Sequence, residues 1–202
     1  MAGRFLVVEG GEASGKTTQV ERLVARLRAV GRDVVETFEP GATGAGAGIR
    51  GLLLDGPAGL DPLAEALLLA ADRAQHVAEV VRPALDRGAD VVSDRYVPSS
   101  LAYQGVARGL GVDTVDELSR LATGGLEPDL VVVLDVSDDV AFDRRPTPSD
   151  RMERAGVAFH SRVRAAYRSL AAERGWTVVD AGTDPETVAD QVWAAVERVP
   201  VS

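Results

Sequence analysis

The feature that most constrains this chain is a glycine-rich octapeptide near its N-terminus, residues 10–17, with the sequence GGEASGKT. It fits the pattern G-x-x-x-x-G-K-[ST] at every specified position, directly after the apolar run Phe5–Val8 and directly before an amphipathic segment. Glycines let backbone N–H groups turn inward around phosphate oxygens, and the start of the following helix offers more of them. The sequence therefore predicts a strand, a phosphate-binding loop and a helix; the flanking segments argue against a chance glycine-rich turn.

The residue types of this octapeptide suit a nucleoside triphosphate. Lys16 can reach the β- and γ-phosphates, and the hydroxyl of Thr17 can ligate Mg²⁺. Glu12 is unusual, since a carboxylate beside phosphates is unfavourable; it either orients an acceptor or faces solvent. We expect ATP to contact Gly10, Gly11, Glu12, Ala13, Ser14, Gly15, Lys16, Thr17 and Thr18.

Apolar periodicity extends this start into an α/β fold. Helix 16–30 should place Val20, Leu23, Val24, Leu27 and Val30 on one face. Strands are predicted at 5–8, 33–38, 90–93, 130–134 and 177–179. Helices are predicted at 16–30, 49–54, 99–108, 113–123 and 158–174, with further helices that begin at residues 61 and 138 and one at the end of the chain. Residues 41–48 are predicted to form a loop. Strands that alternate with helices indicate right-handed crossovers and a parallel sheet covered on both faces. We expect one domain, 1–202, built as a three-layer sandwich around five parallel strands.

Composition narrows the classes of protein and of partner. The net charge of -9 over 202 residues disfavours non-specific binding to nucleic acid or to anionic lipid. The chain contains no cysteine, which excludes disulfides and thiolate metal sites, and no apolar run approaches the length of a membrane span. Residues 1–4 lead straight into a predicted strand, so we expect no secretory signal and a cytoplasmic protein.

Charged residues beyond the loop are candidates for handling a second phosphate. Arginine binds phosphate bidentately, and Lys16 is the only lysine in the chain. Asp94 ends a predicted strand, where ligands bind in parallel sheets, and could hold Mg²⁺. Asp135, which also ends a predicted strand, is the alternative ligand for Mg²⁺, although the preferred interpretation is that Asp135 caps the next helix. The candidate cations are Arg50, Arg73, Arg95, Arg144, Arg145 and Arg151.

Residues 144–153 form a basic, proline-punctuated segment between two predicted helices. Such a composition suits a mobile lid that closes over ATP, but from charge alone an ordinary solvated loop is the preferred interpretation. His76 and His160 lack ligand-spaced partners, so structural roles are expected. Trp176 and Trp193 are expected to pack in or beside the core.

Taken in order along the chain, these landmarks resemble the thymidylate kinase family, and the resemblance covers nearly the whole sequence. The run D-R-Y followed by S-S-x-A-Y-Q-G is the most specific part. The landmarks are residues 9–19 (EGGEASGKTTQ), 39–41 (EPG), 49–50 (IR), 71–76 (ADRAQH), 94–96 (DRY), 99–105 (SSLAYQG), 128–130 (PDL), 150–153 (DRME) and 162–167 (RVRAAY). The resemblance implies a P-loop nucleoside monophosphate kinase fold of the bacterial type, phosphorylation of dTMP to dTDP by ATP with Mg²⁺, and a homodimer.

The resemblance also implies a role for each matching residue. Arg73 would hold the acceptor base or phosphate, Arg95 the dTMP phosphate, and Tyr103 would lie close to the sugar, where a ribose 2′-OH would be crowded. Lid arginines would close on the phosphates, and Asp150 and Glu153 would lie near the acceptor. The implied catalytic residues are Lys16, Arg95, Arg145 and Arg151, the metal ligands Thr17 and Asp94, and the acceptor site Glu12, Phe38, Pro40, Arg50, Leu69, Arg73, Arg95, Ser100, Tyr103 and Gln104.

Several positions depart from the family pattern. Phe38 stands where an arginine is usual, and Leu69 stands where a phenylalanine usually stacks on thymine. Ala42 and Ala47 replace a glycine and a glutamate. These changes leave two alternatives open: a kinase for another or modified pyrimidine deoxynucleotide monophosphate, or a catalytically silent P-loop protein that binds a nucleotide.

Overall fold

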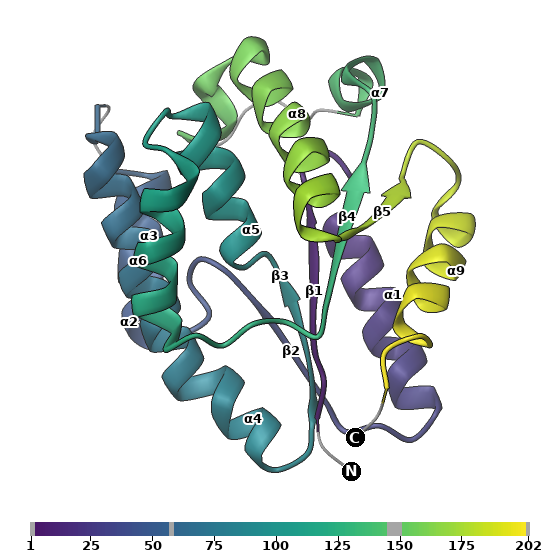
Figure 1. Cartoon of the computed structure of the whole chain (residues 1–202). Helices are drawn as coiled ribbons and strands as arrows, with labels where there is room; N and C mark the ends of the chain where they lie inside the picture. Colours follow the sequence, from purple (N-terminus) through teal and green to yellow (C-terminus); the bar gives the residue numbers. More distant parts are fainter. Residues whose placement is uncertain (1–2, 57–58, 145–150, 201–202) are drawn as a thin grey trace.

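The computed structural model describes residues 3–56, 59–144 and 151–200, apart from the side chain of residue 153. Its centre is a five-stranded sheet in the order β2-β3-β1-β4-β5, in which all four pairings are parallel (Figure 1). The predicted α/β fold is confirmed. The strands are β1 (Phe5–Gly10), β2 (Val34–Phe38), β3 (Asp90–Asp94), β4 (Leu130–Asp135) and β5 (Thr177–Asp180).

Helices cover both faces of this sheet, which makes three layers (Figure 1). One face carries α1 (Lys16–Ala29) and α9 (Pro185–Val196), which pack against each other. The other face carries helical segments of which η1 and η2 are π-helical and η3 is a 3₁₀ turn. They are α2 (Gly44–Leu54), α3 (Pro62–His76), η1 (Val77–Val81), α4 (Arg82–Asp86), α5 (Val97–Ser100), η2 (Leu101–Ala107), α6 (Val112–Thr123), η3 (Glu153–Ala155) and α8 (Val157–Arg174). The short helix α7 (Asp138–Asp143) follows β4, and its Ala141 belongs to the core formed with α1 and α9.

The helical layers on the two faces of the sheet give the molecule two hydrophobic cores, and β1 contributes to both. Successive side chains of a strand point to opposite faces of the sheet, so a strand covered on both sides must be apolar throughout. Phe5 and Val7 accordingly belong to the core that includes residues of η2 and α8, while Leu6 and Val8 belong to the core that includes residues of α1 and α9. All four are about 1% exposed.

Parallel pairing also decides where the functional loops meet. Val8 of β1 and Phe38 of β2 both lie opposite Asp94 of β3, and Gly10 lies opposite Leu134 of β4. The carboxyl ends of the central strands therefore reach one edge of the sheet together. Loop 10–17 and Asp94 are neighbours there, as ligand sites in open α/β sheets require.

Two local predictions are wrong. The predicted loop over 41–48 is helical from Gly44, because the hydroxyl of Thr43 caps the backbone N–H of Gly46 at 2.9 Å. A Cβ at Gly46 would lie 2.4 Å from a carboxylate oxygen of Asp72, so glycine is required there by packing. Val30 does not share the buried face of α1, which ends at Ala29; Val30 is 60% exposed.

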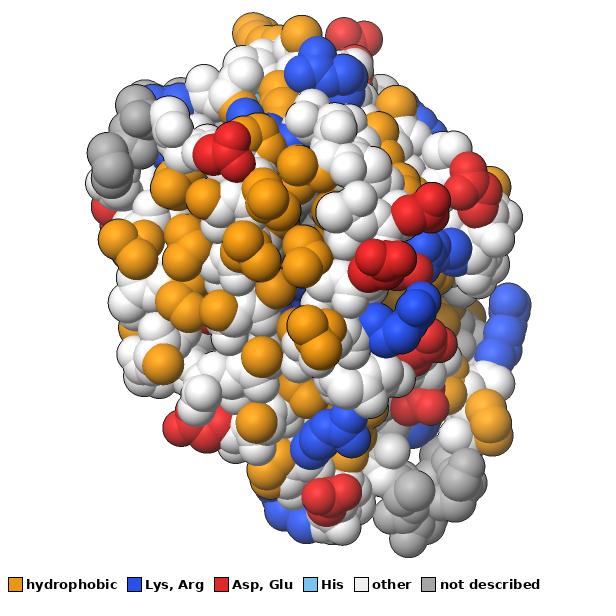
Figure 2. All heavy atoms as spheres, turned by 60° about the vertical axis from the view of Figure 1, so that its left-hand side comes forward, with side chains coloured by type: hydrophobic (Ala, Val, Ile, Leu, Met, Phe, Trp, Pro, Cys, Tyr) orange, Lys and Arg blue, Asp and Glu red, His pale blue; other side chains and the backbone are white. Residues whose placement is uncertain are grey.

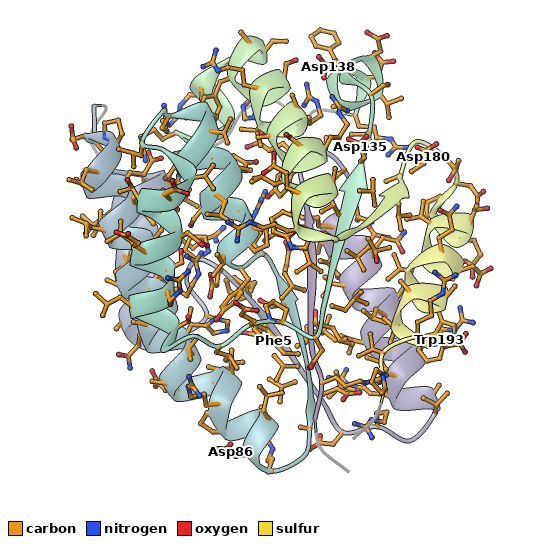
Figure 3. All side chains as sticks on the ribbon, in the orientation of Figure 1. Phe5, Asp86, Asp135, Asp138, Asp180 and Trp193 are labelled. Atoms are coloured by element: carbon orange, nitrogen blue, oxygen red, sulfur yellow. The ribbon has the colours of Figure 1, made fainter. Side chains whose placement is uncertain are left out.

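The predictions for His76 and for the two tryptophans agree with the packing of these side chains. His76 is fully buried between Thr37 and Glu39, with ring nitrogens 2.7 and 2.8 Å from their oxygens. Trp176 and Trp193 are partly buried against the two cores, and Figure 3 places Trp193 on α9. Within the described ranges, no helix combines the length and hydrophobicity needed to cross a bilayer.

A buried carboxylate fixes the amino end of the sheet. Asp90 of β3 accepts hydrogen bonds from the guanidinium groups of Arg4 and Arg32, each at 2.7 Å, and from the backbone N–H of Arg4 at 2.9 Å. Burial opposes the charge of Asp90, but the hydrogen bonds from Arg32 and Arg4 prevail and lower its pKa to about 2.

We predict that Asp90→Asn lowers the free energy of unfolding at pH 7 by about 3 kcal/mol or more, because two buried guanidinium groups lose their counter-charge. The pKa of Asp90 is depressed in the folded state, so its contribution is complete above the unfolded value near 4 and disappears as pH falls through about 2. Denaturant titrations should therefore show a smaller difference in the free energy of unfolding between wild type and Asp90→Asn at pH 3 than at pH 7. Asp33→Asn, which affects only an exposed pair with Arg87, is the control; equal losses for both variants would contradict the account.

Candidate active site

A cavity of about 800 Å³ opens at the carboxyl edge of the sheet, beside loop 10–17. Its wall includes Lys16, Thr17 and Asp94 from the predicted phosphate and metal sites. All ten residues predicted for the acceptor site also line it: Glu12, Phe38, Pro40, Arg50, Leu69, Arg73, Arg95, Ser100, Tyr103 and Gln104. One cavity thus brings together residues that the sequence spreads over about 90 positions.

The loop that forms one end of the cavity depends on glycine. Gly10 has φ 144°, and a Cβ there would lie 2.5 Å from the carbonyl oxygen of Leu134. Gly15 has φ 88° at the N-cap of α1, again in the region that L side chains avoid. Lys16 folds back over this loop, where its ammonium donates to the carbonyl oxygens of Gly10 at 3.2 Å and Gly11 at 3.0 Å.

Arg95 approaches the same point from β3. Its Nη1 donates to the carbonyl oxygen of Gly10 at 3.3 Å, so the ammonium of Lys16 and this guanidinium nitrogen are at most about 6.5 Å apart. Burial and, to a smaller extent, the neighbouring charge of Arg95 lower the pKa of Lys16 to about 8, against the opposing pull of Asp94, Glu9 and Glu12. Two cations held this close in a buried cavity form a site for an anion.

Sequence reasoning treated Glu9 only as a family landmark, but this fully buried carboxylate organises the segment that follows Asp94. It accepts hydrogen bonds from the backbone N–H groups of Tyr96 at 2.8 Å and Ser99 at 3.1 Å, and from the hydroxyl of Tyr167 at 2.7 Å. Burial raises the pKa of Glu9, with Arg95 and these donors opposing the shift. The signal in the sequence was an acidic residue that ends an otherwise apolar strand.

Arg73 is held rigidly in the wall of the cavity and is only 2% exposed. Its Nε donates to Glu39 at 2.8 Å, and its Nη2 donates to the hydroxyl of Ser100 and the carbonyl of Tyr96, both at 3.1 Å. Because His76 binds the other oxygen of Glu39, the orientation of this guanidinium is fixed before any ligand arrives.

The predicted metal ligands fit a divalent cation. The hydroxyl of Thr17 lies 3.4 Å from Oδ2 of Asp94, and Oδ1 of Asp94 is buried without a hydrogen-bond partner in the described part of the chain. Hydroxyl and carboxylate oxygens are the ligands that Mg²⁺ takes.

Asp135 occupies a different environment from the one expected for a metal ligand or a helix cap. Figure 3 shows it at the end of β4. It pairs with Arg168 at 3.0 Å, and the cap of α7 is the hydroxyl of Ser137, which accepts from Val140. The preferred interpretation of Asp135 as a helix cap is therefore wrong.

The arginines of residues 144–153 are only partly described. Arg145 and Asp150 lie outside the described residues, as does the side chain of Glu153. Arg144 donates to the carbonyl of Ala181 at 2.8 Å. Arg151 donates to Glu65 at 2.7 Å and to the carbonyl of Leu53 at 2.8 Å, so in this conformation it contacts neither Lys16 nor Arg95.

Comparisons with known proteins agree with this geometry. The sequence model of the thymidylate kinase family matches residues 8–192. The chain belongs to the thymidylate kinase family. It is 50% identical to the thymidylate kinases of Thermomicrobium roseum (96% of this chain, 95% of the relative) and of Bifidobacterium longum strain DJO10A (98% and 97%). The thymidylate kinase of Deinococcus radiodurans is 46% identical, with 97% of each chain covered.

Family membership confirms the resemblance drawn from the sequence motifs and makes the chain a phosphotransferase. It also identifies the sheet with its glycine loop as a P-loop nucleoside monophosphate kinase fold. Phe38 and Leu69, which depart from the family pattern, line the same cavity as Lys16 and Arg95.

We predict that Lys16 reacts with an amine-acylating reagent with a midpoint near pH 8, because only the neutral amine is nucleophilic and burial lowers the pKa. Peptide mapping by mass spectrometry separates this sole lysine from the N-terminal amine. In denaturant the midpoint should return to about 10.4. ATP should slow the reaction, since phosphate charge favours the ammonium form; a midpoint unchanged by unfolding would contradict the burial of Lys16.

Proposed function

We propose that the chain transfers the γ-phosphoryl group of ATP to the 5′-phosphate of dTMP, giving dTDP and ADP. The observation that carries this proposal is the meeting of Lys16 and Arg95 at the carbonyl of Gly10, on the wall of one cavity. Each cation comes from a different strand end, and each suits one of two phosphates that must face each other. Membership of the thymidylate kinase family supplies the identity of the acceptor.

The residues perform this transfer by alignment and charge compensation. Loop 10–17 and Lys16 hold the triphosphate, while Arg95 holds the acceptor phosphate in line with the γ-phosphorus. An acceptor oxygen forms the new P–O bond as the bond to the β-phosphate oxygen breaks, and the electron pair leaves with ADP. A phosphate monoester is already a competent nucleophile, so no strong general base is needed.

We propose Thr17 and Asp94 as the residues that hold Mg²⁺ when ATP binds. The metal would neutralise charge on the β- and γ-phosphate oxygens. The unpartnered Oδ1 of Asp94 supports this assignment, because a buried carboxylate oxygen without a donor favours a cation nearby.

We propose that the base of the acceptor lies against Arg73, Ser100 and Gln104, with Tyr103 close to the sugar. Leu69 and Phe38 also line this wall, and the guanidinium of Arg50 lies 5.8 Å from the centre of the Phe38 ring. Phe38 is 45% exposed at the cavity and offers an aromatic face that Leu69 lacks. Because that face differs from the usual family arrangement, another pyrimidine deoxynucleotide is the alternative acceptor.

The arginine that completes charge compensation at the transferring group is proposed to be Arg145. Arg151 shares the predicted role, but it would first have to leave both Glu65 and the carbonyl of Leu53. The buried carboxylate of Glu65 is the physical reason that Arg151 lies where it does, since it needs a cationic partner.

We predict that a coupled assay with ATP and Mg²⁺ shows turnover of dTMP and little turnover of AMP, with dUMP and dCMP ranking below dTMP. Lys16→Ala should reduce kcat by about 1000-fold or more, because a charge on the transferring phosphate is left uncompensated. Circular dichroism should show that the variant keeps its fold. Absence of turnover with every pyrimidine deoxynucleotide would refute the assignment, and nucleotide binding without transfer would favour a silent binding protein.

We also propose that the enzyme is a homodimer that associates through α2, α3 and α6. Figure 2 shows apolar side chains gathered over this face of the molecule. Leu52 of α2 and Leu63 and Leu67 of α3 are 54%, 44% and 48% exposed, and α3 packs between its two neighbours. Large exposed apolar patches mark interaction sites, and a self-complementary patch gives a two-fold dimer.

We predict that Leu67→Glu converts the dimer to a monomer, since each protomer would have to bury an unpaired carboxylate in an apolar interface. Sedimentation equilibrium of the wild type and the variant at the same concentration measures the change. Val30→Glu is the matched control, because Val30 is 60% exposed at the end of α1, which covers the opposite face of the sheet. A wild-type protein that sediments as a monomer would contradict the proposal.

A further inference from the structure

Glu65 of α3 is a carboxylate on the cavity wall that no step of the phosphoryl transfer uses. It is 1% exposed and is contacted by three side chains from two segments, Gln104 and Arg108 from η2 and its C-cap, and Arg151. The Nε2 of Gln104 donates to Oε1 at 2.7 Å, Arg151 donates to Oε2 at 2.7 Å, and Arg108 donates to both oxygens at 3.3 and 3.4 Å. A buried carboxylate with this many donors is held in one orientation.

These contacts determine which end of the Gln104 amide faces the cavity. Glu65 lies between two guanidinium groups, and an ionised carboxylate can only accept hydrogen bonds. The NH₂ group of Gln104 must therefore point toward Glu65. Its carbonyl oxygen is turned the other way and is buried, without a hydrogen-bond partner in the described part of the chain. A buried acceptor without a donor is unfavourable, which points to a ligand N–H at this place.

We propose that Glu65 is a positioning residue for acceptor choice: it orients Gln104 so that a carbonyl oxygen meets the imide N–H of a thymine-type base. Cytosine carries an unprotonated ring nitrogen at the corresponding position, so two acceptors would face each other. Arg73, fixed in the same cavity by Glu39, supplies the donor that a neighbouring ring carbonyl requires. This inference rests on the proposed function, since it concerns the base of the same acceptor.

The test measures kcat/KM for dTMP and dCMP at saturating ATP in the wild type, Glu65→Gln and Glu65→Asp. In Glu65→Gln the new amide can donate or accept, so the Gln104 amide is free to reverse. We expect kcat/KM for dTMP to fall about 10- to 100-fold, mainly through KM, while that for dCMP changes less than about threefold. Glu65→Asp keeps the charge beside both arginines but is shorter by one methylene, so it should lose discrimination while retaining the fold.

A double-mutant cycle shows whether Glu65 acts through Gln104. In a Gln104→Met background, Glu65→Gln should no longer change the ratio of dTMP to dCMP turnover. Glu79→Gln is the matched control, because Glu79 accepts from Nε2 of Gln75 at the same distance of 2.7 Å on the exposed surface. It should leave both specificity constants unchanged.

A purely structural role for Glu65 gives a different pattern and would overturn the inference: both acceptors would lose turnover by the same factor, or the ratio would change equally in the Gln104→Met background. If Glu65→Gln fails to fold, the ratio of kcat/KM for dTMP to kcat/KM for dCMP in Glu65→Asp distinguishes the two roles instead. A wild type that uses dTMP and dCMP equally would also overturn the inference while leaving the kinase assignment intact. A wild type inactive with dTMP would instead refute the proposed function.

Discussion

The structure depends on a conflict between two positive charges. Lys16 and Arg95 share the carbonyl oxygen of Gly10, and each would be more stable if the other were absent. The lowered pKa of Lys16, near 8, expresses the burial of this ammonium group and its repulsion by the guanidinium. Phosphates remove both penalties at once. The free enzyme thus keeps its two cations close together at a cost in stability, and substrates bound as proposed would relieve that cost.

Holding these charges in place takes most of the surrounding fold. The parallel register of β1, β3 and β4 brings the glycine loop and Asp94 to one edge, and the Glu9 network fixes the turn that carries Arg95. Arg95 itself adopts φ 75°, a conformation that a side chain with a Cβ avoids unless its surroundings demand it. The strain is located at the residue that is proposed to hold the acceptor phosphate.

Much of this was predictable from the sequence, for physical reasons that differ between elements. The loop at 10–17 is specified by local chemistry, and β1 and β4 by apolar runs that only a doubly covered strand tolerates. Most of the residues predicted for the acceptor site came from the family resemblance, and none came from periodicity. What the sequence did not reveal depends on tertiary contacts: the close approach of Asp72 leaves no room for a Cβ at Gly46 of α2, and Asp135 meets Arg168 from α8. The pairing of Glu65 with Gln104, Arg108 and Arg151 also joins segments far apart in the chain.

The central claim is that two phosphates meet between Lys16 and Arg95. It is tested most directly by a crystal structure of the enzyme with dTMP and a non-hydrolysable ATP analogue. The account predicts hydrogen bonds from Arg95 to the dTMP phosphate and from Lys16 to the terminal phosphate of the analogue, with the two phosphates facing each other. A dTMP phosphate bound away from Arg95, or an analogue bound outside loop 10–17, would contradict it.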